Sequence, residues 1–308
     1  MTTEIMTPAG KSFKSAFIAL IGRPNSGKST LMNAILGEEL AVVTTLPQTT
    51  RQNLRGIYNT DTMQLIFVDT PGIHHGTHSF NKSMVQESAR LLKKRDVDIV
   101  CHIVDCSRYF GNEEDSVVRC VESAGVPVMV IFNKKDLCKN PQETMIAFYQ
   151  RYPTMARHPN VMLSASLPGA KEAFLDAVTP LIPEGPQFFS GDDLSDADMR
   201  FFAAEYIRKH IINNTKEEVP HAVFVEVQAY RESEKRHYIE VNLHVETDGQ
   251  KAIIIGRKGS LIQKIQRDAA ADIEKLTGLP ATVIAHIKIT PHWRDNKRFL
   301  EDRGFFVR

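Results

Sequence analysis

Eight residues near the N-terminus combine glycine, lysine and serine in a pattern that binds phosphate. Residues 22–29 read Gly-Arg-Pro-Asn-Ser-Gly-Lys-Ser and match G-x-x-x-x-G-K-[ST]. The glycines let the backbone approach phosphate oxygens, and the N–H groups at a helix start face the anion. Lys28 is expected to reach the β- and γ-phosphates, and the Ser29 hydroxyl to bind Mg²⁺. The predicted nucleotide contacts from this segment are Gly22, Asn25, Ser26, Gly27, Lys28, Ser29 and Thr30.

A second polar segment indicates which base the site takes. Residues 133–136 read Asn-Lys-Lys-Asp, follow an apolar run and match N-K-x-D. The Asp136 carboxylate can accept from two guanine donors, N1–H and N2–H₂, and adenine lacks this pair. Asn133 is expected to tie this loop to the phosphate loop, and the stem of Lys134 to cover the base. Ser164 and Ala165, in a Ser-Ala-Ser segment after another apolar run, are predicted as the remaining guanine contacts.

Two further loops have the residue types of γ-phosphate sensors. Residues 69–72 read Asp-Thr-Pro-Gly at the end of an apolar run. Asp69 is expected to hold Mg²⁺ through water, and the Gly72 N–H to sense the γ-phosphate. Residues 48–51 read Gln-Thr-Thr-Arg, where Thr50 is the predicted Mg²⁺ ligand and Thr49 the second choice. The γ-phosphate would order both loops. The predicted catalytic residues are Lys28, Thr50 and Gly72, and the predicted metal ligands are Ser29, Thr50 and Asp69.

The residue after this Gly72 is aliphatic. Ras-like enzymes place a glutamine there to orient water, whereas this chain has Ile73. Intrinsic hydrolysis is therefore expected to be slow. Two interpretations stay open for the neighbouring histidines, metal or general-base chemistry on one side and a solvated loop on the other; they are His74, His75 and His78.

The C-terminal part of the chain is basic. From Lys251 to Arg308 there are 12 Lys/Arg and 6 Asp/Glu, a net of 12 − 6 = +6, although the whole chain has a net charge of only +1. Residues 253–259 read Ile-Ile-Ile-Gly-Arg-Lys-Gly. KH domains use such a G-x-x-G turn to clamp the backbone of single-stranded nucleic acid. The predicted RNA-binding residues are Ile255, Gly256, Arg257, Lys258 and Gly259.

Two interpretations stay open for the basic residues after the last predicted strand. Trp293 could stack on a base, with Arg294, Lys297 and Arg298 supplying charge. Alternatively, Trp293 is buried and the basic residues are solvated.

Alternating strands and helices must position the phosphate and base loops. Short apolar runs with turn residues after them indicate buried parallel strands at 16–21, 64–68, 97–104, 126–132 and 161–163. Helical stretches lie between them at 28–36, 81–94, 113–123 and 169–181. We therefore predict an α/β domain with a mostly parallel sheet and helices on both faces, over residues 1–183.

The second half has a different order of elements. A linker is predicted at 184–196, where proline, glycine and several aspartates interrupt the pattern. Residues 197–308 are expected to form an α+β domain. Its predicted order is helix 197–212 (Ser195 as the possible N-cap), strands 221–230 and 237–245, helices 250–255 and 260–276, and strand 282–289. This helix-strand-strand-helix-helix-strand order is that of a type II KH domain.

Composition excludes several classes of protein. The chain is 42% hydrophobic and 24% charged, as expected of a globular protein and not of a disordered one. Its four cysteines form no C-x-x-C pair and fit neither a disulfide framework nor a zinc site, which favours a reducing, cytoplasmic environment. No apolar run is long enough for a membrane span or a signal peptide.

The ordered set of motifs resembles the Era family of bacterial KH-domain GTPases. The matching segments are G-R-P-N-S-G-K-S-T, P-Q-T-T-R, D-T-P-G, N-K-K-D, S-A-S and I-I-G-R-K-G. Other GTPases share the first five, and the combination with a C-terminal type II KH domain is typical of this family. An aliphatic residue after D-T-P-G also fits the family. The chain departs from it at Ser26, often valine, and at Leu167-Pro168, more often a polar pair.

The resemblance implies a Ras-like P-loop GTPase domain followed by a KH domain, with GTP or GDP and Mg²⁺ as ligands. It implies binding to the single-stranded 3′ end of small-subunit ribosomal RNA and a role in assembly of the small ribosomal subunit. We expect a monomer. The resemblance also allows peripheral association with the inner membrane, although the sequence shows no anchor.

Three alternative functions compete with this one. In the first, the protein is an RNA-binding assembly factor for which GTP is mainly a structural ligand, and Ile73 supports it. In the second, a GTPase acts on protein or membrane through a degenerate KH-like module, and Arg257 and Lys258 argue against it. In the third, the enzyme uses ATP, which conflicts with Asp136.

Overall fold

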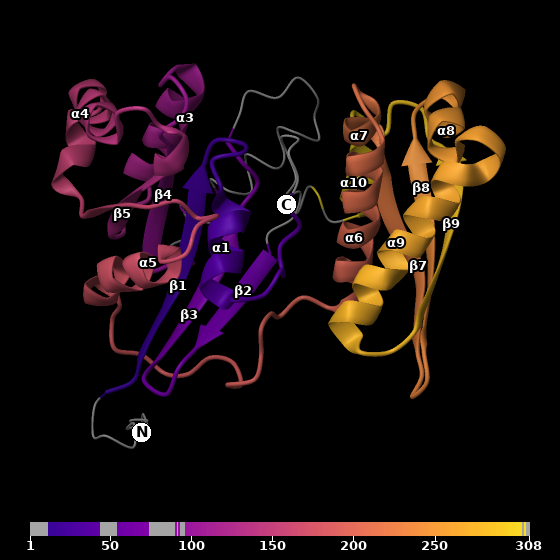
Figure 1. Cartoon of the computed structure of the whole chain (residues 1–308), viewed down its shortest axis with the longest axis horizontal. Coiled ribbons are helices and arrows are strands. Elements are labelled where there is room, and N and C mark those ends of the chain that lie inside the picture. The colour runs from indigo at the N-terminus through magenta and orange to yellow at the C-terminus, as the bar shows by residue number, and fades with distance from the viewer. Residues whose placement is uncertain are drawn as a thin grey trace. The chain divides into compact units, whose positions relative to one another are not determined.

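A computed structural model of the chain describes residues 12–43, 54–73, 90, 92, 96–303 and 305 (Figure 1). The chain divides between Asp196 and Ala197 into two compact units. No helix among the described residues is both long enough and apolar enough to cross a bilayer.

The first unit is built on a six-stranded sheet with the strand order β2-β3-β1-β4-β5-β6. The strands are β1 (Lys14–Gly22), β2 (Leu54–Asn59), β3 (Met63–Asp69), β4 (Ile99–Asp105), β5 (Val128–Asn133) and β6 (Asn160–Met162). All pairings are parallel except the antiparallel pair β2–β3. Every residue of β4 and β5 is buried, because helices cover both faces of the sheet. The predicted α/β class is confirmed.

Helices α1 (Lys28–Leu36), α3 (Asn112–Glu122), α4 (Pro141–Arg151) and α5 (Ala170–Val178) surround this sheet, with the short 3₁₀ turns η1 (Lys135–Leu137), η2 (Pro153–Arg157) and η3 (Thr179–Leu181). On one face, Val117 of α3 and Phe148 of α4 share a core cluster with Val104. On the other, Phe174 of α5 packs on Phe67, with ring centroids 5.6 Å apart.

The sequence prediction missed two elements of this unit. Strand β2 has a glycine at its third position and no long apolar run, so its pairing depends on β3. Helix α4 carried a usable signal, because Pro141 occupies its first turn, where proline is favoured. The helix predicted at 81–94 lies largely outside the described residues.

The segment 184–196, predicted as a linker, is hydrogen-bonded along the edge of the first unit. The side chain of Gln64 is fully buried, donates to the carbonyl of Phe189 (3.0 Å) and accepts from its N–H (3.0 Å). Further along, the Ile57 N–H donates to the carbonyl of Leu194 at 2.9 Å. We call residues 184–196 the strap.

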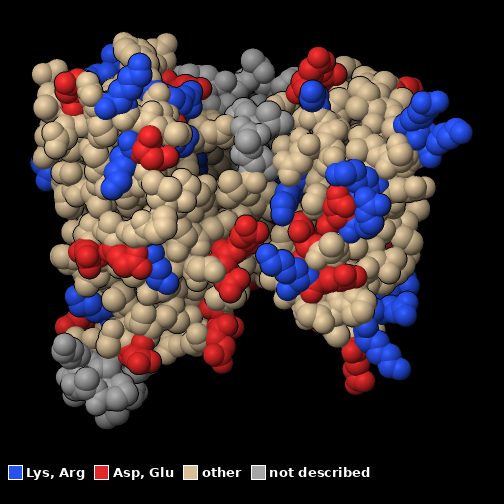
Figure 2. Space-filling view, in the orientation of Figure 1, with Lys and Arg blue, Asp and Glu red and all other residues tan. Residues whose placement is uncertain are grey.

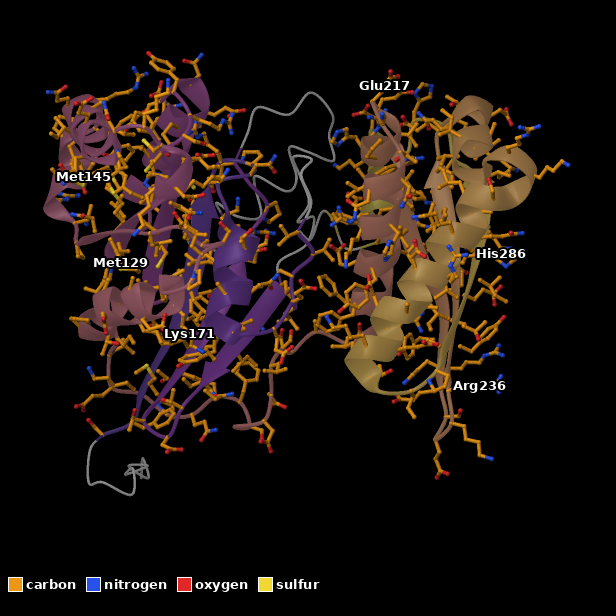
Figure 3. All side chains as sticks on the ribbon, in the orientation of Figure 1. Met129, Met145, Lys171, Glu217, Arg236 and His286 are labelled. Atoms are coloured by element: carbon orange, nitrogen blue, oxygen red, sulfur yellow. The ribbon has the colours of Figure 1, made fainter. Side chains whose placement is uncertain are left out.

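The second unit has a three-stranded sheet in the order β7-β8-β9, with β8 antiparallel to β7 and parallel to β9. The strands are β7 (Phe224–Glu232), β8 (His237–Val245) and β9 (Ala281–Ile289). The helices are α6 (Met199–Asn214), α7 (Val219–Ala222), α8 (Asp248–Ile255), α9 (Ser260–Thr277) and α10 (Lys297–Glu301). Helices α6 and α9 pack together against the sheet, and the turn between β7 and β8 contains Arg236 (Figure 3). The predicted order of the main elements is confirmed.

The N-cap of α6 differs from the prediction. Asp198 caps this helix, and its carboxylate accepts from the Phe201 N–H at 2.8 Å. Ser195 instead donates its hydroxyl to the carbonyl of Arg55 at 2.6 Å, so it belongs to the strap. Both residue types are good caps, and only the path of the strap decided between them.

Candidate nucleotide-binding and RNA-binding sites

The phosphate loop joins the end of β1, at Gly22, to the start of α1, at Lys28. Gly27 has a φ of 99°, and a Cβ there would lie 2.2 Å from Nδ2 of Asn133. Only glycine fits this position. The loop therefore brings its backbone to the first turn of α1, where Ser29 and Thr30 follow.

Lys28 is buried inside this loop. Its Nζ donates to the carbonyl of Arg23 at 3.0 Å and to that of Gly22 at 3.3 Å. Burial lowers the pKa of Lys28 to about 8, although the charges of Asp69 and Glu114 oppose this shift. The ammonium group thus has an unusually high affinity for a further negative charge, which a phosphate would supply.

This pKa predicts how nucleotide binding depends on pH. Bound phosphates would raise the pKa of Lys28. At a pH where Lys28 is neutral in the nucleotide-free protein, nucleotide binding is therefore accompanied by uptake of a proton. Between about pH 7 and 8, where the terminal phosphate of the nucleotide is already ionised, the affinity for GDP or GTP should therefore change little. Above pH 8 it should fall by up to about tenfold per pH unit. Competition binding across this range measures the effect. GMP is the control, because it has the same titrating guanine without a β-phosphate. If the affinity for GDP falls between pH 8 and 9 no more than the affinity for GMP does, the prediction is wrong.

The two predicted Mg²⁺ ligands in the described part of the site lie together. The Ser29 hydroxyl donates to Oδ2 of Asp69 at 2.6 Å, and Asp69 is fully buried at the end of β3. One hydroxyl and one carboxylate are oxygen donors that suit Mg²⁺, which usually completes its shell with water and phosphate oxygens. Thr49 and Thr50 lie outside the described residues. Among those described, no group of three His, Cys, Asp or Glu residues could hold a metal.

The loop after β3 rests directly on the phosphate loop. A Cβ on Gly72 would lie 2.6 Å from the backbone nitrogen of Pro24. The next residue, Ile73, donates its N–H to the carbonyl of Gly22 at 3.1 Å. Any displacement of residues 22–24 would therefore displace Gly72 as well.

The side chain of Ile73 lies in the hydrophobic core. It is 3% exposed and belongs to the cluster that includes Ile21 and Val68. It therefore cannot contact a water molecule beside the phosphates. The histidines with two open interpretations lie outside the described residues; they are His74, His75 and His78.

Asn133 ties three segments together. Its Nδ2 donates to the carbonyl of Ser26 at 2.8 Å, and its Oδ1 accepts from the N–H of Ala165 at 2.9 Å. The predicted connection between the base loop and the phosphate loop is confirmed. The phosphate, N-K-x-D and Ser-Ala-Ser loops thus form one site at the carboxyl ends of β1, β5 and β6.

Lys134 makes contacts that its motif does not predict. Its Nζ donates to the carbonyl of Asn25 at 2.5 Å and pairs with the buried carboxylate of Asp105 at 2.7 Å. Asp105 ends β4 and lies beside Asn133 in the parallel register. Asp105 lies at the end of an apolar run, as Asp69 does, and this position could have marked it as a candidate site residue from the sequence.

Asp136 is exposed, so its carboxylate is accessible to solvent. Its backbone N–H donates to Oγ of the buried Ser164 at 3.1 Å, which fixes the loop independently of the side chain. The structure therefore brings Asp136 and Ser164 together, as predicted, and leaves the carboxylate oxygens to accept hydrogen bonds.

In the second unit, the G-x-x-G turn is a tight connection between α8 and α9. Gly256 has a φ of 71°, and a Cβ there would lie 2.7 Å from Cβ of Leu261. Lys258 also has a positive φ, 53°, and α9 begins directly after the turn. Arg257 and Lys258 are both exposed, and Lys and Arg side chains project from this edge of the unit (Figure 2). Ile255 is half-buried at the end of α8.

Trp293 is buried, so the stacking interpretation for this residue is wrong. It has no exposed surface, and its Nε1 donates to the carbonyl of Ala222 at 2.8 Å. Arg294 is paired with Glu246, through Nε at 3.0 Å. Lys297 and Arg298 are exposed on α10.

Comparison with known protein families identifies both units. Residues 17–134 match a family described as 50S ribosome-binding GTPase, and residues 218–294 match a family described as KH domain.

Two similar relatives with curated names are GTPases. GTPase Era of Geobacter metallireducens is 36% identical over 297 residues, which cover 95% of this chain and 98% of the relative. GTPase Era of Clostridium botulinum is 36% identical over 295 residues, with the same coverage.

Two solved structures resemble the whole chain, each with a TM-score of 0.89, 26% identity and coverage of 96% of this chain and 100% of theirs. One is a single-residue variant of Aquifex aeolicus Era bound to GDP·AlF4⁻. The other is Era in complex with MgGDPNP and nucleotides 1506–1542 of 16S ribosomal RNA.

Proposed function

Because this chain belongs to the Era family of GTPases, we propose that it is a GTP-hydrolysing switch that binds the single-stranded 3′ end of small-subunit ribosomal RNA and acts in assembly of the small ribosomal subunit. The GTPase activity follows from the family itself. The RNA target and the assembly role are the proposed part.

The G-x-x-G turn is the observation that carries the RNA proposal. Its glycines allow close approach of a phosphodiester backbone, and Arg257 and Lys258 present two exposed cations at its tip. An Era structure that covers nearly all of this chain was solved with a segment of 16S ribosomal RNA, which supports the choice of target.

In the GTPase site, we assign the hydrogen bonds to guanine to the carboxylate of Asp136. The rest of the guanine site is assigned to Asn133, Lys134, Ser164 and Ala165. The phosphate oxygens are assigned to the backbone of Gly22, Asn25, Ser26 and Gly27, to Lys28, and to the first turn of α1 at Ser29 and Thr30.

Ser29, Asp69 and Thr50 are the proposed holders of Mg²⁺, which would neutralise charge that develops on the phosphates during hydrolysis. Gly72 is assigned to the γ-phosphate. Because the side chain of Ile73 is buried, the position directly after Gly72 supplies no group that orients water, so we expect slow turnover of the free protein.

The contacts of the strap are evidence in favour of coupling between GTP binding and RNA binding. Strand β2 starts at Leu54, directly after the segment that contains Thr49 and Thr50. At the start of β2, Arg55 pairs with Asp196, the last residue of the strap, at 2.6 Å. Helix α6 of the second unit begins at Met199. A nucleotide-dependent change near Thr50 therefore has a short covalent and hydrogen-bonded path to the second unit.

We further propose that residues 1–183 are the GTPase domain and residues 197–308 the RNA-binding domain, with the strap between them. The protein is proposed to act as a monomer in the cytoplasm, with any membrane association peripheral.

The proposal is tested by RNA binding in the two nucleotide states. A fluorescent oligonucleotide that copies the 3′ end of small-subunit ribosomal RNA is titrated at fixed salt, with a non-hydrolysable GTP analogue and then with GDP. We expect tighter binding with the GTP analogue. A scrambled oligonucleotide of equal length is the control. Equal binding in both states would favour the second candidate, in which GTP is a structural ligand, and the buried Ile73 is the observation that supports it.

A further inference from the structure

We propose that Glu114 is a positioning residue for γ-phosphate recognition in the GTPase reaction. Through Arg23, it fixes the first part of the phosphate loop, residues 22–24, against which Gly72 rests. Neither Arg23 nor Glu114 belongs to the fixed positions of the phosphate-binding pattern, since Arg23 occupies an x position and Glu114 lies on α3.

The pair is buried and close. The Nε of Arg23 lies 2.6 Å from Oε2 of Glu114, and the two side chains are 3% and 0% exposed. The other oxygen, Oε1, lies 2.7 Å from Nε2 of His102, a buried residue of β4. A second contact of Arg23, from Nη1 to the carbonyl of Tyr109, measures 2.9 Å. The carboxylate of Glu114 thus joins the phosphate loop to the sheet through two separate contacts.

Different anchors hold the two parts of the phosphate loop. Asn133 holds Ser26, next to Gly27 and Lys28, where the loop meets the start of α1. The first part is held by the side chain of Arg23, by Arg108, whose Nη1 donates to the carbonyl of Pro24 at 3.2 Å, and by the two hydrogen bonds that Lys28 donates to the backbone. Losing the Arg23 anchor would therefore loosen the first part of the loop and leave the Asn133 anchor of the second part in place.

Gly72 depends on the first part of the loop. A Cβ on Gly72 would lie 2.6 Å from the nitrogen of Pro24, and Ile73 donates to the carbonyl of Gly22. Without Glu114, the buried guanidinium of Arg23 loses its counter-charge, and a buried unpaired charge forces local rearrangement. A shift of residues 22–24 would displace the Gly72 N–H from the γ-phosphate. GDP lacks that phosphate, so its binding should be spared.

The test compares affinities for GDP and for a non-hydrolysable GTP analogue in Glu114→Gln, together with single-turnover hydrolysis of GTP. We expect at least about a tenfold loss of GTP-analogue affinity and of the hydrolysis rate, because one preorganised donor to a reacting phosphate is displaced. The charge of Glu114 also raises the pKa of Lys28, so the comparison is made at about pH 6.5, well below the Lys28 pKa of about 8. Affinity for GDP should then change by less than about twofold. Glu122→Gln is the matched control, because Glu122 is an exposed residue at the end of the same helix and accepts a hydrogen bond from Thr154, outside the phosphate loop.

A second variant separates positioning from folding. Arg23→Met/Glu114→Met removes both buried charges and should keep the fold, because an apolar pair of similar size can replace a buried ion pair. It should show the same selective loss for the GTP analogue. Equal losses for GDP and the GTP analogue, or no loss, in either folded variant would overturn the proposal. This outcome is independent of RNA binding, since the test uses nucleotides alone.

Discussion

Replacing Asp136 by asparagine is expected to abolish the preference for guanine nucleotides and create one for xanthine nucleotides. The carboxylate is exposed and accepts from guanine N1–H and N2–H₂ in our assignment. Asparagine presents an NH₂ donor in place of one acceptor oxygen, which opposes the guanine donor and suits the O2 carbonyl of xanthine. A site that pairs its polar groups with one base rejects a mismatched base strongly, so we expect a loss of at least about 100-fold in GTP affinity.

The fold should tolerate this change. The loop is held by the Asp136 N–H, which donates to Oγ of Ser164, and by the side chain of Asn133. Neither contact involves the substituted carboxylate.

Competition between GTP and XTP for the folded variant measures the switch in preference. Asp61→Asn is the matched control, because Asp61 is an exposed aspartate in the turn between β2 and β3, away from the assigned base contacts. Unchanged guanine preference in Asp136→Asn would refute the assigned base contact.

Charge reversal at the tip of the G-x-x-G turn should abolish RNA binding and leave GTP binding intact. In Arg257→Asp/Lys258→Asp, two cations that would contact phosphates become two anions beside the same backbone. The electrostatic part of the affinity is lost, and RNA affinity should fall by at least about 100-fold at low salt. The glycines and the positive φ of Lys258 stay compatible, because aspartate tolerates this conformation better than most residues.

The control reverses the same number of charges elsewhere in the second unit. Lys235 and Arg236 are exposed in the turn between β7 and β8, at the other end of the sheet from α8 (Figures 1 and 3). Lys235→Asp/Arg236→Asp should change RNA affinity only slightly. If the Arg257/Lys258 variant binds RNA with the affinity and salt dependence of the unsubstituted protein, the clamp lies elsewhere.

The sequence alone determined the class of both units and predicted most of the residues that we assign to the GTP site. The site residues come directly after buried strands, and the ends of parallel strands meet at one edge of a sheet. Short motifs at those ends, such as 22–29 and 133–136, are therefore brought together by the strand order alone. The G-x-x-G turn could also be predicted from the sequence, because Gly256 and Gly259 mark positive φ values within one local segment.

Several features could be decided only by the tertiary structure. Whether Trp293 stacks or is buried depended on how its segment packs against Ala222, 71 residues earlier in the chain. The choice between Ser195 and Asp198 as the N-cap of α6 depended on the path of the strap along β2.

The ion pairs that support the phosphate loop belong to the same category. Lys134 meets Asp105 because β4 and β5 are in a parallel register, and Glu114 reaches Arg23 because α3 packs against β1, the strand that ends at the phosphate loop. Local patterns reveal the backbone conformation and the burial of a segment, since both repeat along the chain. They carry no information about which side chain from another segment arrives at a given point, because that is set by strand register and helix packing.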